Sequence, residues 1–195
     1  AHRDLNAFHT RRSSDVGGSG VGSFGIQIAK LYNCDVIATA SPDKLDKCLE
    51  LGADYAVDHR KEDWHKDVFK ISKEIAKTKG EAPGIDLSFD HIGQTHWNKQ
   101  ISMLKFGGTL VSCGATTGYD AKMDLRHVFF KGTNILGSTQ GTKAELDQGL
   151  YWMGKGKIKV AIDSIHTFEQ AAEAHTKMLT GKGMFGKILM KPEGA

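Results

Sequence analysis

The sequence predicts an α/β fold built on a doubly wound parallel sheet, with helices on both faces. From residue 17 onward, short apolar runs alternate with amphipathic stretches, and this alternation is typical of repeated strand–helix units. A glycine-rich turn at residues 17–25 stands directly before a helical pattern. With 195 residues, the chain has the size of one domain or slightly more.

The expected elements follow one another in chain order. Val21, Phe24, Ile28 and Leu31 fall at helical spacing, so a helix follows the glycines. We expect strands at residues 35–39, 55–57, 85–89, 107–113, 135–137 and 187–190. We expect further helices at residues 41–51, 62–79, 97–104, 125–130, 144–153 and 168–179, of which 62–79 is a polar surface helix.

Composition and charge exclude several classes of function. The net charge is +3 with acidic and basic residues intermixed, whereas a nucleic-acid site would segregate its charge. No run approaches the ~18 apolar residues of a membrane span, and no secretion signal is present. The three cysteines are far apart and form no Cys-x-x-Cys pair. We therefore expect no nucleic-acid or membrane partner, no metal, and a cytoplasmic location.

The glycine turn is the strongest chemical signal. Glycines between a strand and a helix let the backbone approach a pyrophosphate, and the first turn of the helix offers unpaired N–H groups to it. A literal G-x-G-x-x-G match begins too late, because its last glycine lies inside the helix. The residues expected at a dinucleotide are Gly18, Ser19, Gly20, Val21 and Gly22. This turn indicates a Rossmann-type sheet, although a generic strand–helix turn remains the alternative.

Six segments carry a family resemblance. They are GGSGVGSFGIQIAKLYNCDVIATAS, KLDKCLELGADYAVDHRKEDW, GIDLSFDHIG, LKFGGTLVSCGATTG, LRHVFFKGTNILGSTQGT and FEQAAEAHTKMLTGKGMFGKILM. In order and spacing they resemble the cofactor domain of the medium-chain dehydrogenase/reductase superfamily, in particular quinone oxidoreductases and zinc-type alcohol dehydrogenases. The resemblance implies an oxidoreductase that transfers hydride between a nicotinamide cofactor and a small-molecule substrate, namely a quinone, enone, aldehyde or alcohol.

The end of the second expected strand predicts NADP(H) as the cofactor. NAD-specific sites place an acid there to bind the ribose 2′-hydroxyl, but Val36–Ser41 ends without one. Ser41 can donate a hydrogen bond and Lys44 adds a positive charge. The resemblance implies that Lys44 meets the 2′-phosphate and that His59 or Arg60 takes the place of a family tyrosine. A plain surface lysine at position 44 remains the alternative.

The resemblance also implies which residues surround the nicotinamide. They are His91, Gly114, Ala115, Gly137, Ser138, Phe185, Gly186 and Lys187. We interpret His91 as a packing or hydrogen-bonding residue of the pocket wall rather than as a catalytic one. No catalytic residue is named, because family members carry a catalytic domain ahead of the cofactor domain and we expect most of it to be lacking. The chain alone is therefore expected to turn over poorly.

The segment before the glycines is unusual for this fold. Residues 10–15 are Thr-Arg-Arg-Ser-Ser-Asp, where an apolar strand of about five residues should stand. We expect the first strand to be missing or replaced. Residues 1–15 are then an irregular remnant, such as the basic tail of a natural fragment, or an artefact in which two pieces of one gene were joined across a misassembled gap. Residues 16–195 are an NADP(H)-binding domain with strand and helix elements at its C-terminal end. Residues 1–5, Ala-His-Arg-Asp-Leu, resemble a segment of the family's catalytic domain, in which zinc-dependent relatives have a metal-binding cysteine at the place of Ala1. An arbitrary short match remains the alternative.

Two other readings stay open, together with one expected partner. A methyltransferase on the same architecture would need an acidic residue after the second strand to bind the ribose hydroxyls, and Ala40-Ser41 does not supply one. A non-enzymatic nucleotide-binding module descended from a reductase would not need to keep the glycine turn. A homodimer through the edge of the cofactor-domain sheet is a further expectation.

Overall fold

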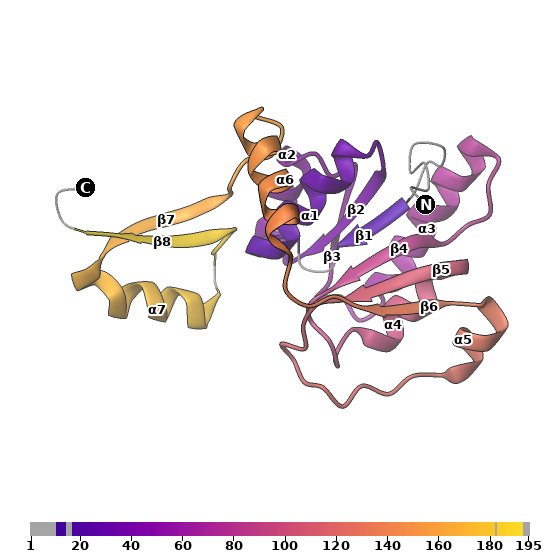
Figure 1. The fold of residues 1–195 in the computed structure, drawn as a ribbon. Helices are drawn as coiled ribbons and strands as arrows, with labels where there is room; N and C mark the ends of the chain where they lie inside the picture. The colour runs from indigo at the N-terminus through magenta and orange to yellow at the C-terminus, as the bar shows by residue number, and fades with distance from the viewer. Residues whose placement is uncertain (1–10, 15–16, 182, 193–195) are drawn as a thin grey trace.

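One six-stranded parallel sheet, in the order β3-β2-β1-β4-β5-β6, organises the computed structural model (Figure 1). The structure describes residues 11–14, 17–181 and 183–192, the first four by their backbone. The strands are β1 (Arg11–Ser14), β2 (Asp35–Ala40), β3 (Tyr55–Asp58), β4 (Ile85–Asp90), β5 (Leu104–Ser112) and β6 (Asn134–Gly137). Strands β2 and β3 extend the sheet on one side of β1, and strands β4, β5 and β6 extend it on the other side. This is the doubly wound order that the sequence predicted.

Helices connect the strands at the positions that the apolar periodicity indicated, within a few residues. They are α1 (Gly20–Leu31), α2 (Leu45–Glu50), α3 (Trp64–Lys79), α4 (Trp97–Met103), α5 (Leu125–Lys131), α6 (Lys143–Gly154) and α7 (Ala171–Thr180). Short 3-10 helices, η1 (Pro42–Lys44) and η2 (Phe168–Gln170), precede α2 and α7. The Ser19 side chain caps α1 by accepting from the Gly22 N–H.

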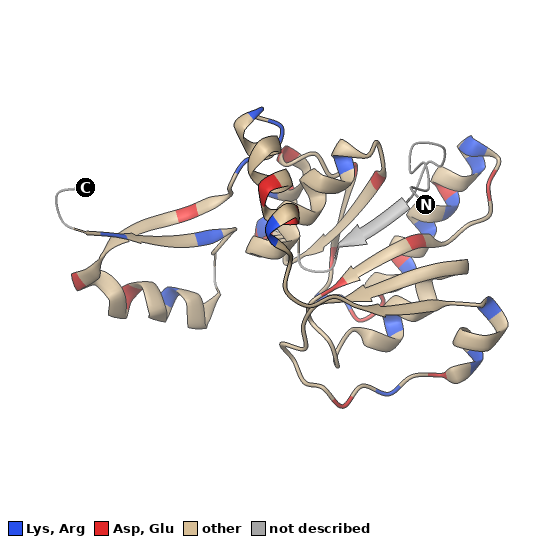
Figure 2. Cartoon of the chain, in the orientation of Figure 1, with Lys and Arg blue, Asp and Glu red and all other residues tan. Residues whose placement is uncertain are grey.

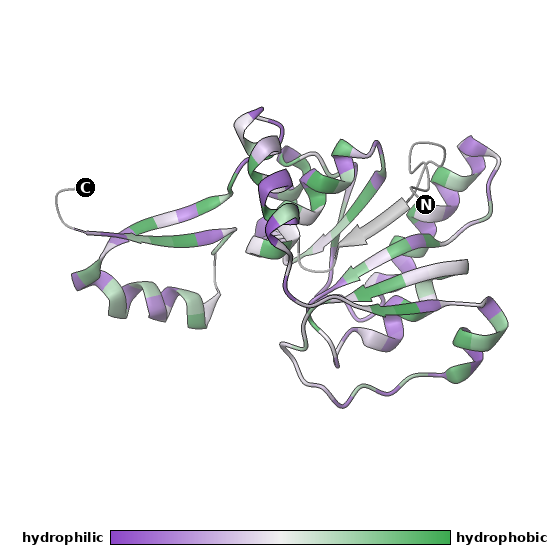
Figure 3. Ribbon diagram, viewed as in Figure 1, coloured by the Kyte–Doolittle hydropathy of each residue, from purple (hydrophilic) through white to green (hydrophobic). Residues whose placement is uncertain are grey.

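Two apolar cores lie on opposite faces of the sheet, because successive side chains of a strand point to opposite sides. Val36, Ala38 and Ala40 of β2 join the core shared with α1 and α2. Ile37, between them, joins the other core, which α3 and α4 cover. The helix α3 is therefore only partly the surface helix we expected, since Trp64 and Val68 are buried. Figure 3 shows apolar residues recurring along these strands.

Strand β1 corrects the expectation of an irregular N-terminal segment. The backbone of Arg11–Ser14 pairs in parallel with β2 on one side and β4 on the other. A strand is thus present at the centre of the sheet, but polar residues supply it, so the first strand is replaced and not missing. Residues 1–10 and 15, also predicted to be irregular, lie outside the described residues.

A separate arm extends from the end of α6 (Figure 1). It consists of β7 (Ile162–Thr167), α7 and β8 (Lys187–Lys191), with the two strands parallel in a sheet of their own. Strand β7 was not foreseen, because Ile162 and Ile165 are three residues apart and do not alternate. The arm returns to the main sheet through the Gly186 N–H, which donates to the Gly18 carbonyl at 2.9 Å.

Figure 2 shows the positions of lysine and arginine interspersed along the chain with those of aspartate and glutamate. This is the mixed pattern that the sequence indicated. Among the residues that the structure describes, no helix combines the length and the apolar character needed to cross a membrane.

Candidate functional site

The glycine turn lies where β1 meets α1, at the carboxyl edge of the sheet. The Gly17 N–H donates to the Thr39 carbonyl at 2.6 Å, which ties the turn to β2. A Cβ on Gly17 would lie 2.9 Å from the Cys48 Sγ, so any larger residue here would force the packed side chains around it to shift. The first turn of α1 begins at Gly20, where backbone N–H groups have no acceptor within the helix, and the Ser19 side chain satisfies the N–H of Gly22. A helix start of this kind binds anions.

Two lysines border the turn. A Cβ on Gly18 would lie 2.7 Å from the Lys44 Cδ, and one on Gly20 would lie 2.7 Å from the Lys187 Nζ. Both side chains thus lie directly against the glycines. A cation beside a helix N-terminus is unfavourable on its own, because both carry positive charge. An anion bound at the helix start would be attracted by the helix and by the Lys187 ammonium, whereas the Lys44 ammonium lies at the Gly181 carbonyl.

The end of β2 carries a polar group of four residues. Ser41 is buried, and the Lys44 Nζ donates to the Gly181 carbonyl at 3.2 Å. Arg60 lies 3.8 Å from the carboxylate of Asp43. A hydrogen bond from Ser41 lowers the pKa of Asp43, with the Gly183 N–H contributing. The sequence reasoning found Ser41, Lys44 and Arg60 but missed Asp43, an acid just beyond the strand end.

His59 lies apart from this group. Its N–H donates to the Ala40 carbonyl at 3.1 Å, which holds the end of β3 beside β2. Its ring packs against His96, with 5.5 Å between ring centroids, and His96 packs in turn on Trp64. Of the two residues suggested for the role of the family tyrosine, Arg60 lies with Asp43, whereas the His59 ring lies in this aromatic cluster.

His91 connects two loops of the site. Its Nε2 lies 3.1 Å from the Oγ of Ser19, the residue that caps α1. Its carbonyl accepts a hydrogen bond from the Thr116 hydroxyl at 2.9 Å. Gly114 packs so closely that a Cβ there would lie 2.9 Å from the His91 carbonyl oxygen. His91 therefore holds the turn after β4 between the glycine turn and the loop after β5.

A buried carboxylate fixes the turn that carries His91. Asp90 is fully buried and accepts hydrogen bonds from the N–H groups of Ile92 and Gly93, at 3.0 and 3.2 Å. The Gln100 amide donates to it at 2.8 Å and the Ser112 hydroxyl at 3.3 Å. Four donors, two from the turn after β4 and one each from α4 and β5, thus meet on one carboxylate. The sequence reasoning read Asp90 only as part of the turn and missed its role.

The remaining predicted residues lie along the same edge. Ala115 follows Gly114 and contacts Gly93, where an added Cβ would lie 2.9 Å from the Ala115 Cα. Gly137 ends β6, and the Ser138 N–H donates to the Ser112 carbonyl at 2.8 Å. These residues line the edge beyond β5, so the predicted nicotinamide side extends across β4, β5 and β6.

The arm supplies the last three predicted residues. Phe185 is buried in the core that α1 and α2 share, so its ring packs inside the protein. Gly186 has a φ of +87°, and a Cβ there would clash with the Ala161 carbonyl, so glycine is required for the arm to approach Ser19. Lys187 then extends over Gly20, as described above.

A zinc ion does not fit the residues that the structure describes. No group of three or more His, Cys, Asp or Glu side chains among them is arranged to hold a metal. Burial raises the pKa of Cys48 to about 12 and also raises that of the exposed Cys113. Zinc binds the thiolate, so neither thiol is suited to it. The expectation of no metal remains a prediction for the whole chain.

Comparison with known proteins gives a consistent group of relatives. Residues 20–155 match the family model described as zinc-binding dehydrogenase. "Dehydrogenase FUB6" of Fusarium oxysporum f. sp. lycopersici is 31% identical, over 89% of this chain and 50% of that protein. "Quinone oxidoreductase" of Pongo abelii is 29% identical, over 88% of this chain and 51% of that protein. The chain spans about half the length of these curated relatives.

Solved structures agree with the fold. The crystal structure of an "NAD-dependent alcohol dehydrogenase" is 34% identical with a TM-score of 0.82, over 93% of this chain and 51% of that one. A crotonyl-CoA carboxylase/reductase in complex with NADP is 21% identical, with a TM-score of 0.81, over 93% of this chain and 49% of that one. At that identity the second comparison concerns the fold alone.

Proposed function

Since this chain belongs to the zinc-binding dehydrogenases of the medium-chain dehydrogenase/reductase superfamily, we propose that it is the NADP(H)-binding part of an oxidoreductase. The observation that carries the proposal is the glycine turn, with its capped helix start and the Lys44 and Lys187 side chains against it. Glycines that leave room at the turn, the start of α1 and the Lys187 ammonium beside Gly20 together fit a dinucleotide pyrophosphate.

When bound, the nicotinamide would supply or accept the hydride. The residues of this chain would bind and orient the cofactor. Gly18 to Gly22 would hold the pyrophosphate, while His91, Gly114, Ala115, Gly137 and Ser138 would line the nicotinamide side. The relatives include a quinone oxidoreductase and proteins named crotonyl-CoA reductase. We accordingly propose a quinone, enone, aldehyde or alcohol as the substrate of the whole protein.

The preference for NADP(H) over NAD(H) rests on charge. Lys44 and Arg60 lie near the end of β2, which itself lacks an acid at Ala40-Ser41. The Asp43 carboxylate opposes this preference, but its hydrogen bonds with Ser41 and the Gly183 N–H and its proximity to Arg60 offset its charge. Lys44 would exchange the neutral Gly181 carbonyl for a phosphate, which is the stronger partner.

The test is the binding of both reduced cofactors to the Lys44→Ala variant of the full chain. A charge-assisted contact is worth about 1–3 kcal/mol, so the NADPH dissociation constant should rise by about 5- to 150-fold while that of NADH changes little. Lys77→Ala is the matched control, because Lys77 is an exposed lysine of α3. Equal losses for the two cofactors would reject the assignment of Lys44 to the 2′-phosphate.

We also propose that the protein binds no zinc, which metal analysis can test. The three cysteines show no ligand geometry among the described residues. Purified protein should therefore contain no stoichiometric zinc by atomic emission, before or after dialysis against a zinc buffer. One tightly held zinc per chain would overturn this part of the proposal.

We further propose a cytoplasmic protein that forms a homodimer through β6. The strand β6 is the last of the sheet, and Leu136 within it is 53% exposed. An open edge of this kind can pair with a second copy. Light scattering should give a mass of two chains for the unsubstituted protein and a mass of one chain for the Leu136→Lys variant. A monomeric mass for the unsubstituted chain would exclude the dimer.

A further inference from the structure

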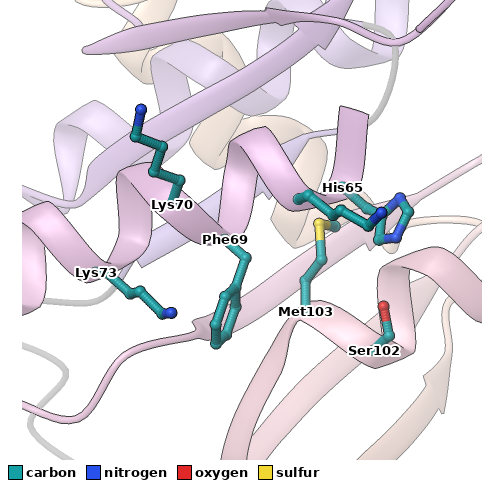
Figure 4. A pocket seen from close by; sticks show the side chains of 7 residues that line it. His65, Phe69, Lys70, Lys73, Ser102 and Met103 are labelled. Carbon is teal, nitrogen blue, oxygen red and sulfur yellow. The ribbon is translucent and has the colours of Figure 1, made fainter. Parts of the chain in front are cut away.

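A cavity of about 370 Å³ lies between α3 and α4, away from the glycine turn (Figure 4). It lies on the sheet face that α3 and α4 cover, whereas α1 packs on the other face. None of the residues assigned above to the cofactor lines it. Its lining residues are His65, Lys66, Phe69, Lys70, Lys73, Ser102 and Met103. The volume falls in the range of about 300–1,000 Å³ that small-molecule sites occupy.

One ridge of α3 forms a wall of this cavity. His65, Phe69 and Lys73 are four residues apart, so they lie on the same face of the helix. Phe69 provides an apolar ring, and Met103 of α4, which is almost fully buried in the core, borders the cavity from the other helix (Figure 4). The Lys73 Nζ lies 5.1 Å from the centroid of the Phe69 ring. An apolar wall and a cation are therefore in direct contact.

The charge of the cavity is one-sided. Its lining includes three lysines and a histidine but no acid. Lys66 is bound to Asp63 at 2.9 Å, whereas Lys73 forms no ion pair with any described side chain. Lys131 adds a further cation beside Ser102, since its Nζ donates to the Ser102 carbonyl at 2.8 Å. Low-dielectric walls lined by one sign of charge concentrate ions of the other sign.

We propose that this cavity binds an amphipathic organic anion. A flat apolar group would pack against the Phe69 ring, and a carboxylate, sulfonate or phosphate on it would pair with Lys73 and Lys66. A fully apolar ligand would leave the lysines without a counter-charge, and a small inorganic anion would leave the Phe69 ring uncovered. The site is separate from the proposed cofactor site and does not depend on it.

The test titrates the full chain with 8-anilinonaphthalene-1-sulfonate, an aromatic sulfonate, both without NADP⁺ and with NADP⁺ in excess. Lys73→Glu and Lys77→Glu form a matched pair, because each reverses one exposed lysine on α3 and changes the net charge equally. Lys77 lies outside the cavity lining. Lys73→Glu should weaken binding about tenfold through repulsion within the cavity, whereas Lys77→Glu should leave it within about twofold of the starting value.

The same experiment can overturn the proposal. Three results would contradict the proposal: no saturable binding of the probe, equal affinities of the two charge-reversal variants, or displacement of the probe by NADP⁺. The first would mean that the chain does not bind the anion, and the other two that the anion binds outside this cavity. If Lys73→Glu lowers the melting temperature, Lys73→Gln replaces it and should still weaken binding more than Lys77→Gln does. Failure of these outcomes leaves the cofactor proposal untouched, because the Lys44→Ala titration tests that separately.

Discussion

Residues 17–112 enclose two apolar cores, whereas residues 113–192 leave most of their large apolar side chains exposed. In the first part Ile37, Ile101 and Leu110 are fully buried. In the second part α5 and α6 contain no buried residue, and Phe129 and Leu179 are 74% and 86% exposed.

This difference shows that the interactions that form a helix are distinct from those that bury it. The helix α6 has a complete capping box, in which the Thr142 and Glu145 side chains each bind the other's backbone. Local bonds of this kind define where a helix begins without any core beneath it. Burial in the first part depends instead on strands that pair over long sequence distances, such as β1 with β4.

The largest expected effect on stability comes from replacing the polar central strand of the first part, which we expect to be destabilising. Replacing residues 10–15 with a run of Val, Leu and Ile should stabilise the chain by roughly 3–6 kcal/mol, given the apolar area that a central strand buries. The urea unfolding midpoint should rise, and NADPH should bind more tightly because β1 positions the glycine turn. Unchanged midpoint and affinity would show that the polar strand is no weakness.

A matched pair of truncations measures the contrast between the two parts directly. Ile101→Ala removes a fully buried side chain from the core that α3 and α4 cover, at an expected cost of about 2–5 kcal/mol. Leu150→Ala removes a side chain that is 53% exposed on α6, at an expected cost below about 0.5 kcal/mol. Both free energies come from urea unfolding. A comparable loss in Leu150→Ala would mean that the second part is covered in solution.

Sequence periodicity was sufficient to predict most helices and strands, but not the elements that form only through tertiary contacts. The spacing of Val21, Phe24 and Ile28 located α1, and the family resemblance located the residues along the carboxyl edge. The polar run at residues 11–14 has no strand pattern, and only pairing with β2 and β4 makes it one. The Lys44–Gly181 bond joins residues 137 apart, a proximity that no local pattern encodes.

Asp90 tests whether the buried polar bonds of the first part hold the site in place. Asp90→Ala leaves the Gln100 amide and two turn N–H groups without their acceptor, at an expected cost of about 1–3 kcal/mol. Asp90→Asn keeps one acceptor oxygen and should recover part of the loss. NADPH affinity should fall more than in Ile101→Ala at matched stability, measured by titration at a temperature where both variants are folded. Equal affinities would leave Asp90 with a structural role only.

The smallest expected effect concerns the attachment of the arm in the second part, and it depends on pH. Asp163 is buried, and its carboxylate accepts from the Phe185 N–H at 2.9 Å and pairs with Lys177. Burial raises the pKa of Asp163, but the hydrogen bonds from Lys177 and Phe185 outweigh it, so the pKa lies below the ordinary value of 3.8. A lowered pKa means that the folded state binds the proton less readily than the unfolded state does.

The stabilisation from Asp163 is therefore complete above about pH 5 and is lost as the pH falls below about 4, through the lowered pKa. Because Phe185 anchors the arm in the core of α1 and α2, the arm should loosen first. Amide exchange should show the Phe185 and Lys187 N–H groups losing protection at a higher pH than those of Ile37 and Ala38 in β2, after correction for intrinsic exchange rates. The Asp163→Asn variant should show this loss already at pH 7. If the arm and β2 lose protection together in both cases, the arm is part of the same cooperative unit as the sheet.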